Sequence, residues 1–313
     1  MSDLASTRSL APEVAQTSAK GRAEPFGTRP KRLSPGRIGL YAFLIMASAF
    51  FLLPIYVMFI TSFKTLDEVR LGNIFSTPEI WTVAPWIKAW SSACTGLECG
   101  GISIGFWNSV RILVPSVIAS IFVGSLTGYA LTFWRAKHGN VLFAVILFGA
   151  FMPYQIFLYP LVRTFSFLNM NSSMLALVTA HVIFGLPVMT LVFRNFYASL
   201  PQEMFKAARI DGGGFFQIFF YLILPMSTPM IAVALILQVT GIWNDYVLGV
   251  VFGGLQNRPM TVQLINIVAP SGAEIEYNVN MAATILTALV PLLIYFVSGR
   301  WFVRGIAAGA IKG

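Results

Sequence analysis

The feature that most constrains this chain is a series of six long apolar runs separated by more polar segments. The runs cover residues 38–60, 112–134, 141–162, 174–193, 230–252 and 281–299. Each can cross a hydrocarbon core of about 30 Å as an α-helix, and a backbone in lipid must satisfy its own hydrogen bonds. Only 11% of the 313 residues are charged, against roughly 25% in soluble domains. The sequence therefore predicts an all-α membrane protein with six transmembrane helices.

Prolines interrupt most of these runs. They are Pro54, Pro115, Pro153, Pro160, Pro187 and Pro291. A proline inside a helix removes one backbone donor, and neighbouring helices can cover the carbonyl that is left. We therefore expect kinks at these positions.

The distribution of positive charge predicts the topology. Of the 21 Lys and Arg residues, 15 lie on the side of the two termini and six on the other. The positive-inside rule then places both termini in the cytoplasm. Residues 1–37 form a flexible basic tail without the apolar core of a signal peptide, and 38–313 form the membrane domain. The net charge of +9 is thus a topology signal and does not indicate a nucleic-acid partner.

The loop 194–227, on the predicted cytoplasmic side, is longer than a helix hairpin needs. Ser199 as N-cap and Gln202 three residues later predict a capping box, with a short helix to about Ile210. The run from Asp211 to Gly214 stops it, and a second helical piece begins near Phe215. Such a short amphipathic helix fits a docking element, with an interfacial helix lying on lipid as the alternative.

This loop resembles that of a known family. The run LPQEMFKAARIDGGG at 200–214, followed by Pro225 and Pro229, is similar to the EAA loop of ABC importer permeases. The segments FRNFY at 193–197, WNDY at 243–246 and the terminus 302–313 resemble carbohydrate permeases of the maltose type, small-permease branch. The segments 94–101 and 276–283 more closely resemble glucose/mannose permeases of Gram-negative bacteria. The resemblance implies the type I permease fold, with loop 194–227 carrying the coupling helix.

The resemblance also implies partners. They are a second homologous permease, an ATPase homodimer that binds ATP and Mg, and a periplasmic sugar-binding protein. The chain has no phosphate-binding motif of its own, so we expect a non-enzymatic permease without cofactor or metal in the bacterial inner membrane. Lys206 stands where the family has glutamate.

The resemblance further implies roles for three groups of residues. Contacts to the ATPase are expected from Glu203, Lys206, Ala207, Ala208, Asp211, Gly212 and Gly213. A terminal segment with Gly309, Lys312 and Gly313 is expected at the ATPase interface. A flexible polar tip with Gly254, Gln256 and Asn257 is expected to contact the binding protein.

Polar residues within the apolar runs are candidates for the translocation path. They are Tyr154, Gln155, Gln238, Trp243, Asn244 and Asp245. Amides and a carboxylate beside aromatic rings suit a sugar, whereas hydrogen bonding between helices is the structural alternative. The resemblance to glucose/mannose permeases implies a monosaccharide such as glucose or mannose as the substrate. An oligosaccharide, a polyol or glycoside, and a secondary transporter are alternatives.

The two histidines and the two cysteines each allow a functional and a structural interpretation. His138 is expected in solvent and His181 as a hydrogen-bonded structural residue, which disfavours a membrane-embedded enzyme. Cys94 and Cys99 lie in an outer loop containing glycine, where an oxidising periplasm favours a disulfide. A reduced pair is the alternative.

Overall fold

The computed structural model describes residues 35–96, 98–134, 137–269 and 274–310, the stretch 300–310 by its backbone alone. The chain divides into two compact units, Met1–Leu53 and Pro54–Gly313, and the division lies inside the first helix. That helix, α1 (Pro35–Thr61), already includes the last three residues of the predicted tail. The rest of the tail lies outside the described residues.

Four helices in the described part are long and apolar enough to cross a membrane as single spans. They are α1, α4 (Ser103–Phe133), α7 (Met174–Ala198) and α14 (Tyr277–Ala310), the last of these through Gly299. Two further spans are bent pairs of helices. The predicted all-α membrane fold with up to six spans is therefore confirmed.

Two of the apolar runs do not form one continuous helix. The run 141–162 breaks at Pro153 into α5 (Gly139–Phe151) and α6 (Gln155–Phe167), which meet at 105°. The run 230–252 is also interrupted, because α11 (Thr228–Trp243) ends at the polar pair Asn244 and Asp245. A separate short helix, α12 (Val247–Phe252), follows.

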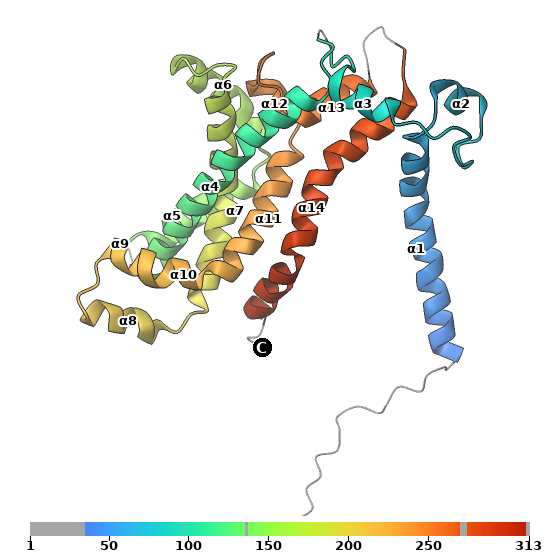
Figure 1. Ribbon diagram of the computed structural model, residues 1–313. Helices are drawn as coiled ribbons and strands as arrows, with labels where there is room; N and C mark the ends of the chain where they lie inside the picture. Colours follow the sequence, from blue (N-terminus) through green and yellow to red (C-terminus); the bar gives the residue numbers. More distant parts are fainter. Residues whose placement is uncertain (1–34, 97, 135–136, 270–273, 311–313) are drawn as a thin grey trace, which may run out of the picture. The chain divides into compact units, whose positions relative to one another are not determined.

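The remaining helices lie at the two ends of the spans (Figure 1). At the end where α4 begins lie α2 (Leu66–Leu71), α3 (Ala84–Ser91) and α13 (Met260–Val268). At the opposite end lie α8 (Gln202–Ile210), α9 (Phe215–Ile218), the π-helical segment η1 (Phe219–Ile223) and α10 (Leu224–Met226). The bend between the last of these and α11 is 78°.

The centre of the second unit is the close pair α4 and α7. A Cβ atom added at Gly124 would lie 2.4 Å from Cβ of Met189, and one at Gly128 would lie 2.9 Å from the backbone nitrogen of Arg194. Small residues let helix backbones approach closely, which is a main source of packing energy in lipid. This pair, with α11 packed against both helices and α14 packed against α11, fixes the ends of the spans and thereby the candidate sites.

Candidate functional site

The helix α8 is attached to the end of the spans by one aromatic side chain. Phe205 is the buried residue of α8, and its ring stacks on Phe133 of α4 with centroids 4.7 Å apart. The rings of Tyr129 and Trp134 meet it edge-on at 6.3 and 6.1 Å. An anchor of this kind holds a short helix that its own hydrogen bonds would barely stabilise.

The opposite face of α8 is open. Glu203, Lys206 and Ala207 are exposed, and Ile210 is 86% exposed. Arg209 is also exposed but lies on the inward side, with its guanidinium 5.0 Å from the ring centroid of Trp134. The helix therefore has an inward face that holds it and an outward face that is presented.

Ala208 lies on the inward side. It is half-buried and packs against the aromatic cluster around Tyr129 and Phe205. Ala208 is therefore less accessible to a partner than Ala207, and its expected contact to an ATPase stays a prediction. The exposed small residue of α8 is Ala207.

The start of α8 differs from its prediction, whereas its end agrees. Pro201 is the N-cap, and the Ser199 hydroxyl donates to the carbonyl of Phe196 at 2.7 Å, so the predicted capping box at Ser199 is wrong. The helix ends at Ile210, and Gly212 then has φ +85° with no neighbour near its Cα. The Gly213 N–H closes the turn on the carbonyl of Ala208 at 2.9 Å.

A second feature is a polar pocket among the spans. It has a volume of about 300 Å³ and lies between α5, the connection from α5 to α6, α7 and the connection from α11 to α12. Its polar lining comes from Tyr154, His181, Gln238 and Asp245. Phe184 adds an aromatic face, since its ring meets Tyr154 edge-on at 5.8 Å. The pocket thus combines amide, carboxylate, imidazole and phenol groups within an apolar surrounding.

Asp245 is held at the start of α12. Its carboxylate accepts the N–H groups of Leu248 at 3.4 Å and Gly249 at 3.1 Å, as expected for an acid at a helix N-terminus. His181 Nε2 lies 4.0 Å from Asp245 Oδ2. The interruption at residues 244–246 therefore turns a carboxylate toward an imidazole across the pocket.

The structure brings together only part of the predicted path. Tyr154, Gln238 and Asp245 line the pocket, whereas Gln155 and Asn244 are exposed and do not. Trp243 is buried against α14, where its Nε1–H donates to the carbonyl of Thr287 at 2.9 Å. That hydrogen bond is the helix–helix alternative, and the expectation that Trp243 faces the path is wrong.

His181 was expected to be a structural residue and was not among the residues predicted for the translocation path. It is buried and lines the pocket beside Asp245, 64 positions away in the chain. No local signal marks it, because the two residues meet only when α7 packs against α11 and α12.

Known proteins identify the family. Residues 120–308 match the family described as the binding-protein-dependent transport system inner membrane component. The chain belongs to this family. The permease is 36% identical to a probable ABC transporter permease of Pyrococcus horikoshii over 287 residues, covering 90% of this chain and 100% of the relative.

Two further similarities bear on relatives and fold. The permease is 34% identical over 264 residues to the alpha-glucoside transport system permease protein AglG of Rhizobium meliloti, covering 81% of this chain and 67% of the relative. A solved bacterial ABC transporter that imports alginate gives a TM-score of 0.73 at 19% identity, covering 88% of this chain and 99% of that one. The latter shows the fold alone and confirms the ABC importer permease architecture. These relatives do not single out a glucose/mannose subgroup of Gram-negative bacteria.

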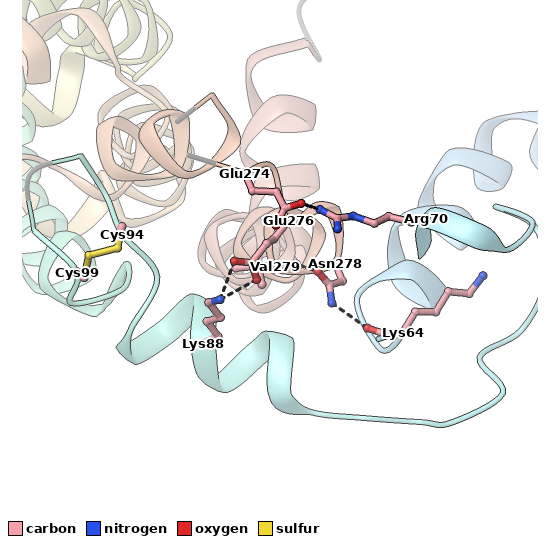
Figure 2. A network of polar contacts seen from close by, with 9 residues as sticks. All are labelled: Lys64, Arg70, Lys88, Cys94, Cys99, Glu274, Glu276, Asn278 and Val279. Atoms are coloured by element: carbon pink, nitrogen blue, oxygen red, sulfur yellow. Dashed lines mark hydrogen bonds and ion pairs between the residues drawn. A yellow bond between two sulfur atoms is a disulfide. The ribbon is translucent and has the colours of Figure 1, made fainter. Parts of the chain in front are cut away.

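At the other end of the permease, polar contacts tie the loop after α1 to the start of α14 (Figure 2). Lys88 of α3 pairs with Glu276 at 2.6 and 2.8 Å, and Arg70 of α2 pairs with Glu274. Asn278 donates to the carbonyl of Lys64 at 3.0 Å. These contacts join segments about 200 positions apart into one surface.

The loop after α1 also contains a buried lysine and a disulfide. The Lys64 ammonium is buried and donates to the carbonyl of Asn73 at 2.9 Å and to Ser76 Oγ at 3.1 Å. Cys94 and Cys99 are joined by a disulfide. The loop after α1 is therefore organised by its own contacts.

The segment after α12 is also organised. Gly254 has φ +61°, and a Cβ atom there would lie 2.6 Å from Cβ of Ser172. Asn257 donates to the carbonyl of Ser172 at 3.0 Å, and Asn108 donates to the carbonyl of Gln256 at 2.9 Å. The prediction of a flexible tip at these residues is therefore wrong, whereas their role toward a binding protein stays a prediction.

The C-terminal segment is helical as far as it is described. Gly309 lies within α14, which continues to Ala310. Lys312 and Gly313 lie outside the described residues.

Proposed function

We propose that this permease forms half of the translocation path of an ABC sugar importer, with a second permease as the other half. A periplasmic sugar-binding protein would deliver the substrate, and an ATPase homodimer would bind ATP and Mg and drive transport. The similarity to a permease named for alpha-glucoside transport supports a sugar as substrate.

The observation that carries the proposal is the polar pocket among the spans. Polar groups within a membrane are costly and typically mark substrate pathways. Gln238 and Asp245 supply hydrogen-bonding groups, while Tyr154 and Phe184 supply aromatic surface, which is the combination that suits a sugar. The pocket of about 300 Å³ lies at the lower end of the range for small-molecule sites. That size favours a single sugar unit such as glucose or mannose over a longer glycoside.

The outward face of α8 is the proposed contact to an ATPase. Glu203, Lys206 and Ala207 are presented on it, and the turn at Asp211, Gly212 and Gly213 ends it. Closure of the ATPase dimer on ATP binding would push this helix, whose inward face is fixed to α4 through Phe205. The motion would thus reach the spans that line the pocket.

The proposal is tested in proteoliposomes that contain the assembled importer. Uptake of labelled glucose, mannose and maltose is measured for the natural protein, for Gln238→Leu and for Gln155→Leu. Gln155 is a matched control because it is the same residue type in an exposed position outside the pocket. Loss of one hydrogen bond costs about 1–3 kcal/mol when it leaves a buried polar group unpaired, so the Gln238 variant should lose roughly tenfold in uptake efficiency.

Two outcomes contradict the proposal. If both variants transport as the natural protein does, the pocket is not part of the path. If neither glucose nor mannose is taken up but maltose is, the monosaccharide assignment is wrong and the glycoside alternative holds. Copurification of all subunits with each variant shows that assembly is intact.

A further inference from the structure

A second hollow lies at the α8 end of the spans and has no part in the proposed sugar path. Its volume is about 470 Å³. It is enclosed by the end of α4, the start of α5, the end of α7 and the first residue of α8. Its lining is Leu131, Thr132, Lys137, His138, Gly139, Asn140, Val141, Arg194, Ala198 and Gln202.

The charged residues that line this hollow are both basic. They are Lys137 and Arg194, and none of its lining residues is acidic. The Arg194 guanidinium carbon lies 4.0 Å from the ring centroid of Phe143. A cation over an aromatic face is held in place while its N–H groups remain directed outward from the ring. The hollow also contains the N-terminus of the 13-residue helix α5, where backbone N–H groups favour an anion.

An apolar groove continues from the basic hollow along α5. It is lined by Asn140, Val141, Ala144, Val145 and Phe148 and has a volume of about 520 Å³. Asn140 and Val141 line both hollows, so the two are contiguous. Ala144, Val145 and Phe148 are exposed on a helix that belongs to a membrane span.

We infer that the basic hollow and the α5 groove together form a site for an anionic phospholipid. The phosphate of the headgroup occupies the hollow between Lys137 and Arg194, and an acyl chain lies in the groove along α5. Basic pockets at the ends of transmembrane helices suit anionic headgroups. A free phosphate compound would satisfy the same basic groups, but it would leave the adjoining apolar groove without an occupant.

The site has a consequence for the coupling segment. Ala198 and Gln202 of its lining are the last residue of α7 and the first residue of α8. A bound headgroup therefore contacts the connection through which α8 is attached. If α8 has the role proposed above, this lipid supports coupling, but binding itself is testable without that role.

The experiment measures lipid binding to the assembled importer by native mass spectrometry. The probes are dioleoylphosphatidylglycerol, dioleoylphosphatidylcholine and glycerol 3-phosphate, the last of which has the phosphate but no acyl chains. The variants are Lys137→Gln, which alters an exposed side chain, Arg194→Gln and Ala144→Phe, which fills the groove. Arg163→Gln is the matched control, because it removes an exposed positive charge from α6 outside both hollows.

The natural protein should retain phosphatidylglycerol in preference to phosphatidylcholine. Lys137→Gln and Arg194→Gln should each weaken phosphatidylglycerol binding about fivefold, the effect of one basic residue near an anionic lipid. Ala144→Phe should weaken lipid binding and leave glycerol 3-phosphate unaffected, while Arg163→Gln should change neither.

Three results would overturn the inference. Equal loss in the Arg163 variant would show that general surface charge attracts the lipid. Glycerol 3-phosphate binding as tightly as the lipid would assign the hollow to a free phosphate compound. Unchanged phosphatidylglycerol binding in Lys137→Gln would remove the hollow from lipid binding altogether.

Discussion

Replacement of Phe205 by alanine should uncouple the importer without removing any residue from the outward face of α8. Phe205 is the buried residue of that helix. Its ring contacts Phe133, Tyr129 and Trp134 at centroid distances of 4.7, 6.3 and 6.1 Å. A nine-residue helix is too short to be stable alone, so its position depends on this side chain.

The expected magnitude follows from the contacts. Truncation of a buried phenylalanine to alanine costs about 3–5 kcal/mol. Since each 1.4 kcal/mol is a factor of ten, the ratio of attached to detached α8 should fall by roughly 10² to 4 × 10³. Leucine at the same position keeps most of the apolar burial and loses the ring pairs, each of which is worth about 0.5–1.5 kcal/mol. Phe205→Leu should therefore be intermediate.

The assay compares sugar transported with ATP hydrolysed in proteoliposomes. Phe205→Ala should lower this ratio severely and Phe205→Leu moderately, and hydrogen exchange should report faster exchange of the α8 amides in the same order. A Phe205→Ala importer that keeps both the natural ratio and the natural exchange rates would refute the reasoning. Equal effects of alanine and leucine would also refute it, because the apolar burial that leucine keeps would then contribute nothing to the position of α8.

Three further predictions concern single positions. Gly212→Ala should reduce sugar-stimulated ATPase activity more than Lys206→Ala, because a side chain at φ +85° costs about 1–2 kcal/mol and an exposed charge about 0–1 kcal/mol; the reverse order would contradict it. Freshly isolated protein should show no alkylated thiol at Cys94 or Cys99 without reductant, and two labelled thiols in mass spectrometry would exclude the disulfide. Gly254→Ala should lower the midpoint of thermal unfolding by several degrees, since its φ of +61° and the Ser172 side chain, 2.6 Å from an added Cβ, leave no room for Cβ; an unchanged midpoint would show that the turn adjusts.

The spans could be predicted because the physics of lipid acts on composition. Any apolar run of this length must become helix, so all six runs correspond to helical segments. What composition does not determine is whether a run remains one helix. Pro115 and Pro187 lie inside continuous helices, whereas the chain breaks at Pro153 and bends by 105°. Whether a proline breaks a helix depends on how neighbouring helices pack around it. The hydropathy of a run carries no information about that packing.

The candidate sites also include some features that the local sequence predicts and others that depend on the packing of distant helices. The end of α8 at Gly212 was predictable, because a left-handed residue after a helix favours glycine. The pairing of His181 with Asp245 was not, since it needs the packing of α7 against the end of α11. Ser199 is a third case, because the capping-box motif is present in the sequence but a competing hydrogen bond replaces it. The Ser199 hydroxyl donates to the carbonyl of Phe196, as serine at the end of a helix readily does.

The unusual lysine of α8 is best understood from the division of that helix into two faces. The inward face is fixed by the permease itself, through Phe205 and Ala208. The outward face is available for contact with a partner. Lys206 lies on this face, and Glu203 lies three residues earlier, one helical turn away. Exposed charges contribute little to a contact, whereas a small residue such as Ala207 sets how closely two backbones approach. A reversed charge at Lys206 is therefore compatible with docking as long as the fixed inward face continues to present Ala207 and the turn at Gly212 in the same place.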